Sequence, residues 1–133
     1  MRRIIVVASA VFASLFFAAT PAWAGSPHFV EATATVDGNT LTVSGKEAGL
    51  GNETQVHIVV TATALCINNG GHHPKAVNKG SFSAEGDFPV QNGKAEFSLT
   101  LIATFQPDCT PPMTVSWTDI VVTDTEHGVT KRL

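Results

Sequence analysis

The sequence predicts an all-β domain, a two-sheet antiparallel β-sandwich of immunoglobulin-like architecture with about seven strands and one disulfide. Three observations predict it. Apolar and polar residues alternate in runs rich in threonine and valine, which is the period of a half-buried strand. Turn signals separate these runs at short, regular intervals. No run after residue 24 repeats its apolar residues at helical spacing.

Residues 1–24 have the order of a cleavable secretory signal peptide. Arg2 and Arg3 precede an uncharged apolar run over 4–19, and Ala22-Trp23-Ala24 is a small-residue cleavage site. A transmembrane anchor is the alternative, but the run is shorter than the roughly 20 residues needed to span a bilayer, and Pro21 ends it. We expect one domain, residues 25–133, to be secreted to the extracellular space with no membrane contact after cleavage.

The charge of this domain argues against nucleic acid as a partner. Residues 25–133 contain six basic and eleven acidic residues, so their net charge is −5. Such a surface repels phosphate. The basic residues also form no stripe interleaved with aromatic residues, as single-stranded nucleic acid would require.

The chain contains two cysteines, Cys66 and Cys109. In an oxidising compartment, an isolated pair in a small domain predicts a disulfide, which stabilises the fold by about 4 kcal/mol in the chain-entropy model. A bridged pair leaves no thiolate for catalysis. Trp117 follows both cysteines, so the Cys-Trp-Cys order of antibody domains is missing, and immunoglobulin-like describes an architecture only.

The first hairpin is expected at Asp37-Gly38, a strong two-residue turn signal. This turn would pair Ala34 with Leu41 and Ala32 with Val43, which places apolar residues on one face.

Two strands are expected to form the centre of the core, since each places its apolar residues on one face. In 54–66 these are the even positions Val56, Ile58, Val60, Ala62, Ala64 and Cys66. In 94–105 these are the odd positions Ala95, Phe97, Leu99, Leu101, Ala103 and Phe105.

A second hairpin is expected at Asn92-Gly93, where a two-residue loop would pair Gln91 with Lys94 and Phe88 with Phe97. The same register would pair Val90 with Ala95. Residues 82–84 form a further strand, followed by an edge segment that carries Pro89, which has no amide hydrogen to donate to a neighbour.

The last strands are expected at 113–123 and 129–132. In the first, the apolar phase runs through Met113, Val115 and Trp117 and then changes to Ile120 and Val122. This change of phase predicts a β-bulge near Thr118-Asp119.

Two loops are the candidate site. The stretch 67–80 reads as the longest irregular segment, and Cys66 precedes it, whereas Cys109 lies inside the loop 106–112. A disulfide would bring both loops to one end of the sandwich. The candidate binding residues are Asn68, Asn69, His72, His73, Lys75, Asn78, Lys79 and Asp108.

These polar side chains suit a ligand-recognition surface for a sugar or a peptide, although an ordinary solvated loop uses the same residue types. His72 and His73, with Asp108 nearby, form a weaker alternative metal site, because adjacent residues seldom bind one ion and no further ligand spacing supports them. We therefore expect no metal and no cofactor. His28, His57 and His127 are expected to be solvated surface residues.

No catalytic motif is present: there is no G-x-S-x-G elbow, no H-E-x-x-H pair, no phosphate-binding glycine loop and no calcium loop. Asp87, Asp108, Asp119 and Asp124 are expected to be solvated carboxylates, not an acid–base pair. The expected function is a secreted, non-enzymatic module that binds a cell-envelope glycan or protein. The alternative is a structural protein that associates with itself.

Three segments, CINNGGHHPK (66–75), FPVQNGKA (88–95) and CTPPMTV (109–115), resemble those of an uncharacterised family of small secreted actinobacterial proteins. The resemblance covers most of the chain after residue 24 and implies a secreted β-sandwich. It implies no activity, ligand or residue role.

Overall fold

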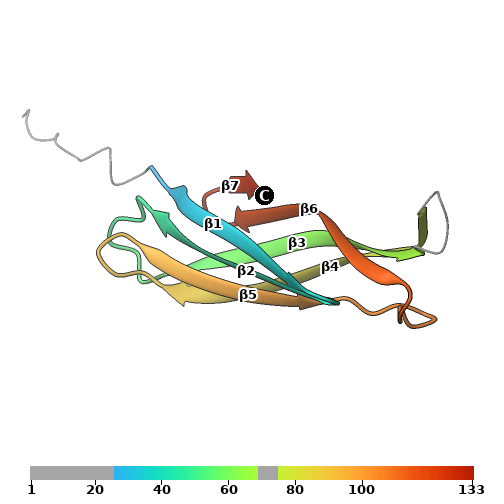
Figure 1. The fold of residues 1–133 in the computed structure, drawn as a ribbon. Helices are drawn as coiled ribbons and strands as arrows, with labels where there is room; N and C mark the ends of the chain where they lie inside the picture. Colours follow the sequence, from blue (N-terminus) through green and yellow to red (C-terminus); the bar gives the residue numbers. More distant parts are fainter. Residues whose placement is uncertain (1–25, 69–74) are drawn as a thin grey trace, which may run out of the picture.

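The computed structural model describes residues 26–68 and 75–133 and contains seven β-strands in two antiparallel sheets (Figure 1). The three-stranded sheet has the order β1 (His28–Asp37), β2 (Thr40–Ala48), β5 (Ala95–Ile102). The four-stranded sheet has the order β4 (Lys75–Pro89), β3 (Gln55–Asn68), β6 (Thr114–Asp124), β7 (Val129–Arg132). The predicted all-β sandwich is confirmed. The expected signal peptide lies outside the described residues, which contain no helix able to cross a membrane.

The core lies between the sheets and is built from the alternating faces that the sequence predicts. All six even positions of β3 from Val56 to Cys66 are buried. In and just after β5, Ala95, Phe97, Leu101, Ala103 and Phe105 are buried, while Leu99 is partly buried against the same core. The β2 residues Leu41 and Val43 complete the contact from the three-stranded sheet.

The predicted disulfide is confirmed. The Sγ atoms of Cys66 and Cys109 are 2.06 Å apart and their Cα atoms 5.8 Å apart. Around the bridge, a second apolar cluster extends the core to the end of the sandwich. Its buried members are Ala64, Cys66, Ala103 and Phe105.

The first hairpin forms, but its turn lies one residue later than predicted. Val43 pairs with Ala34, not with Ala32, and Asp37 pairs with Thr40, so Gly38-Asn39 is the two-residue loop. Gly38 has a φ of 63° at the first central position, where glycine is favoured. Asn39 is held from outside the hairpin, because its carbonyl accepts a hydrogen bond from the Ala103 amide at 2.8 Å. Each residue pairs two positions away from its predicted partner, so the same side chains still share one face of the sheet.

The second turn forms as predicted, but the strands beside it do not pair. Asn92 and Gly93 have positive φ angles, and Gln91 forms a bridge with Lys94. Beyond that bridge, β4 pairs with β3 and β5 pairs with β2. The predicted ladder between Val90 and Ala95 is therefore wrong: the chain crosses from one sheet to the other. Phe88 and Phe97 do meet, but across the core, with ring centroids 6.2 Å apart.

The irregular stretch expected over 67–80 is mostly strand. β3 continues to Asn68, and β4 begins at Lys75 and runs without a break to Pro89, so only 69–74 lie between them. The pairing of Lys79 with Leu65 and of Asn78 with Cys66 satisfies the backbone of this polar segment, which its composition did not reveal. Pro89 lies on an edge strand, as predicted, and is the last residue of β4.

The predicted bulge in β6 and the short last strand are confirmed. Along β3, Thr61 pairs with Val121 and Thr63 pairs with Thr118, so β6 carries one extra residue at this point. Asp119 within it has a φ of 53°. After the bulge, Ile120 and Val122 return to the buried face.

Replacing both Cys66 and Cys109 with serine is expected to lower the free energy of unfolding by about 2–4 kcal/mol, because the bridge restricts the unfolded chain. Urea unfolding of the wild type and the variant measures this difference. Dithiothreitol should destabilise only the wild type, and a variant as stable as the oxidised wild type would contradict the prediction.

Candidate functional site

The disulfide holds the β5–β6 connection against the end of β3, at the right of Figure 1, where the β1–β2 turn also lies. This connection is tied down at two further points. The Asn39 side-chain amide donates a hydrogen bond to the Ala103 carbonyl oxygen at 3.3 Å. The Asn78 side-chain amide donates one to the Gln106 carbonyl oxygen at 3.2 Å. The described part of the loop end is therefore fixed by covalent and polar contacts.

The structure brings some of the predicted binding residues together and separates others. Asn78 faces the disulfide side of β4, since it pairs with Cys66, and Asp108 lies in the loop that carries Cys109. Lys79 is the next residue along β4, so its side chain points to the opposite face of the sheet. Asn68 and Lys75 are strand partners at the ends of β3 and β4.

Three of the predicted binding residues, Asn69, His72 and His73, lie outside the described residues. The weak metal alternative at the two histidines stays a prediction for the same reason.

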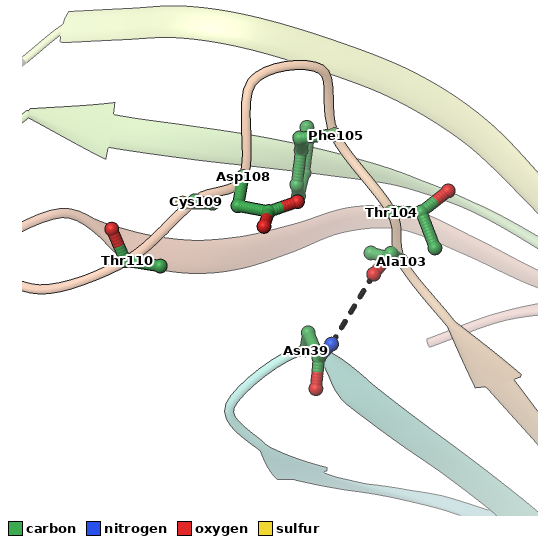
Figure 2. Close-up of a pocket in the computed structure, with 7 residues that line it drawn as sticks. All are labelled: Asn39, Ala103, Thr104, Phe105, Asp108, Cys109 and Thr110. Carbon is green, nitrogen blue, oxygen red and sulfur yellow. Dashed lines mark hydrogen bonds between the residues drawn. The ribbon is translucent and has the colours of Figure 1, made fainter.

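A pocket of about 320 Å³ lies beside the disulfide, between the β1–β2 turn and the β5–β6 connection (Figure 2). Asp108 and Asn39 lie on opposite sides of it, and Thr110 adds a hydroxyl group. Its lining residues are Asn39, Ala103, Thr104, Phe105, Asp108, Cys109 and Thr110. The sequence did not point to Asn39, because only the folding of the β1–β2 hairpin over the far loop brings it here.

A second pocket of about 120 Å³ lies close to the same bridge and is lined by Cys66, Asn78, Pro107 and Met113. It is mostly apolar, and the amide of Asn78 is already bonded to Gln106. The larger pocket therefore offers more polar groups to a ligand.

A cluster of three carboxyl groups and a histidine, of which Glu47 and Asp124 are fully buried, lies toward the other end of the sandwich. Glu47 comes from β2, Asp124 from the end of β6, His127 from the β6–β7 turn and Glu53 from the β2–β3 loop. His127 Nδ1 donates to Asp124 Oδ2 at 2.7 Å, and His127 Nε2 donates to Glu53 Oε2 at 2.6 Å. The cluster therefore connects the two sheets.

Glu47 is the most unusual member, because its side chain is 0% exposed and neither carboxyl oxygen receives a hydrogen bond from an N–H or O–H group of the described residues. Burial raises the pKa of the Glu47 carboxyl to about 8, and the adjacent Asp124 carboxylate adds to the rise.

Asp124 and His127 correct two expectations, since both were expected to be solvated. Asp124 is 0% exposed, and its Oδ1 accepts hydrogen bonds from the amides of Glu126 and His127 at 2.9 and 3.1 Å. Burial works against ionisation of both groups. The hydrogen bonds to these groups favour the charged forms more strongly than burial disfavours them. The pKa of Asp124 is therefore lowered and the pKa of His127 is raised. Asp124 is the last inward residue of β6, and the turn that follows supplies the two amides that bind its Oδ1.

The cluster was missed, although the alternation along each strand contains a signal for its two carboxylates. Glu47 continues the inward odd positions of Leu41 and Val43, and Asp124 continues the inward even positions of Ile120 and Val122. An acidic residue at an inward position is unusual enough to mark a site. That Glu47 and Asp124 meet depends on how the two sheets pack.

His57 lies on the outer face of β3, as its odd position predicts, but it is not simply solvated. Its Nδ1 is 2.7 Å from Asp87 Oδ1 and its Nε2 is 2.8 Å from Glu85 Oε1, both on β4. The hydrogen bond to Glu85 raises the pKa of His57 most, and the hydrogen bond to Asp87 raises it further.

Comparison with protein-family models, curated proteins and solved structures found no match to this chain.

NMR titration of the His57 ring protons is expected to give a midpoint above the ordinary value of 6.5. Because the pKa is raised in the folded state, the stabilisation by this group is complete below pH 6.5 and is lost as the pH rises through the folded midpoint. Replacing Glu85 with glutamine and Asp87 with asparagine should move the midpoint back toward 6.5. An unchanged midpoint would show that these carboxylates do not hold the charge.

Replacing Asp124 with asparagine is expected to lower the free energy of unfolding by about 2–4 kcal/mol, because His127 loses its buried ionic partner. Urea unfolding at pH 6 measures the change. Asp119→Asn is the matched control. Asp119 is exposed, and its ion pair with the exposed Arg132, 3.5 Å away, contributes little to stability. Equal stabilities of the two variants would contradict the prediction.

Proposed function

We propose that the protein is a secreted, non-enzymatic binding module that contacts a cell-envelope glycan through the disulfide-held end of its sandwich. The observation that carries this proposal is the pocket between Asn39 and Asp108, whose walls are fixed by the Cys66–Cys109 bridge. A pocket of about 320 Å³ is within the range of small-ligand sites.

The chemistry of the lining suits a sugar better than a phosphate or an apolar ligand. Asp108 and Thr110 can accept or donate hydrogen bonds with ring hydroxyls, while Asp108 repels anions. Phe105 adds an aromatic ring to the lining. A fixed loop loses little conformational entropy on binding, so weak polar contacts can give measurable affinity.

Two further features support a secreted immunoglobulin-like module. Disulfides persist mainly in oxidising compartments, which agrees with the export signal expected over residues 1–24. The connections β2–β3, β4–β5 and β5–β6 cross from one sheet to the other, as the Greek-key connections of immunoglobulin-like sandwiches do.

A sedimentation assay with purified cell-wall glycan tests the proposal. Asp108→Ala and Thr110→Ala are each expected to weaken binding about tenfold, since each removes hydrogen bonds to the sugar. Their melting temperatures should stay close to that of the wild type, because both side chains are exposed.

Glu96→Gln is the matched control, as Glu96 is an exposed acidic residue on β5 outside the pocket. Wild-type protein that stays in the supernatant would refute glycan binding. Binding that is unchanged in both pocket variants would place the contact elsewhere.

A further inference from the structure

Glu47 is an acid at a position where packing alone would favour an apolar residue. It occupies an inward position of β2 in line with Leu41 and Val43, where an apolar side chain would pack without cost. Burying a carboxyl group without hydrogen-bond donors is unfavourable, and replacing buried ionic groups with apolar ones is often neutral or stabilising. A fully buried polar group left without donors in a native fold calls for an explanation such as a bound ion.

The Glu47 carboxyl points at two other potential ligands. One oxygen of Glu47, one oxygen of Asp124 and one ring nitrogen of His127 all lie within 4.8 Å of one another. A cation with ligand bonds of about 2.1 Å keeps its ligand atoms about 3.0–3.4 Å apart, so small side-chain rotations would bring these three groups to coordination distance.

We propose that Glu47, Asp124 and His127 bind a divalent cation of the zinc class, with His127 coordinating through Nδ1 and Glu53 orienting the ring. The proposal is independent of glycan binding at the disulfide end.

The position of Glu53 supports the role of His127. Metal-binding histidines usually donate their other ring N–H to a carboxylate, which fixes the tautomer and the orientation of the ring. Glu53 Oε2 accepts this bond from Nε2 at 2.6 Å, which directs Nδ1 toward Asp124 and Glu47. In the cation-free protein, the Nδ1 proton lies between His127 and Asp124 where the cation would bind.

The ligand set selects the class of cation. Two carboxylates balance the charge of a divalent ion, and the neutral imidazole is a ligand that zinc favours. Calcium takes six to eight oxygen ligands, and magnesium keeps several waters, so neither suits a buried site with two carboxylates and an imidazole. His127 and Glu53, with side chains 23% and 36% exposed, give the ion a route from solvent.

Such an ion would join β2 of one sheet to β6 of the other, far from the disulfide. Asp124 pairs with Ile58 on β3, whereas the disulfide leaves β3 at Cys66, eight residues or about 26 Å further along the strand. The sandwich would thus have a covalent link at one end and a metal link toward the other.

The test measures the effect of Zn²⁺ on protein treated with EDTA and dialysed. One equivalent of Zn²⁺ is expected to bind per chain by calorimetry and to raise the melting temperature by about 5 °C or more. Glu47→Gln and His127→Gln should each abolish the zinc-dependent rise, whatever their stability without metal. His127→Gln replaces a partly exposed turn residue, so it serves if Glu47→Gln does not fold.

Matched controls separate this site from its competitors. Glu126 lies in the same turn but belongs to a different and more exposed set of possible ligands, together with Glu53 and His127. The variant Glu126→Gln should therefore keep the zinc-dependent rise. The double variant His72→Gln/His73→Gln should keep it as well. The proposal would be overturned if Zn²⁺ did not raise the melting temperature, or if the rise persisted in both ligand variants. It would also be overturned if either control lost the rise, or if Ca²⁺ alone produced it.

Discussion

The structure depends on the alternation of side chains along β3, the long strand at the centre of the four-stranded sheet. Its even positions from Val56 to Cys66 are all buried, and they face the three-stranded sheet across the core. Since successive residues of a strand point to opposite faces, a shift of one residue would expose this whole row. The same register directs Cys66 inward, so the position of the disulfide follows from the packing of β3.

Polar groups are concentrated toward the two ends of this row. At the Cys66 end, the bridge, the Asn39 amide and the Asn78 amide hold the β5–β6 connection and form a pocket with polar walls. Toward the other end, the last inward positions of β2 and β6 are carboxyl groups instead of apolar ones. A carboxyl group in a core is unfavourable, so packing alone does not account for these two residues. Binding at the first end and ion coordination at the second would use different residues and can be separated by mutation.

The connections between strands show where local patterns stop being informative. Asn92-Gly93 makes the turn that its residue types favour, yet β4 and β5 join different sheets. A turn determines the local path of the chain, whereas strand pairing depends on which neighbour buries more apolar surface and satisfies more backbone groups. Similarly, the polar composition of residues 75–80 resembles a loop, but every residue of this segment except Val77 pairs with a residue of β3.

The sequence by itself determined the all-β class, the inward faces of the central strands, the disulfide, the bulge in β6 and the short last strand. These features depend on alternation and residue chemistry within one segment, which the sequence displays directly. Only the tertiary structure decided which strands pair, that Asn39 reaches the disulfide pocket, and that Glu47, Asp124 and His127 meet. Those contacts join residues up to 80 positions apart in the chain, and they depend on how two sheets pack, which no local pattern encodes.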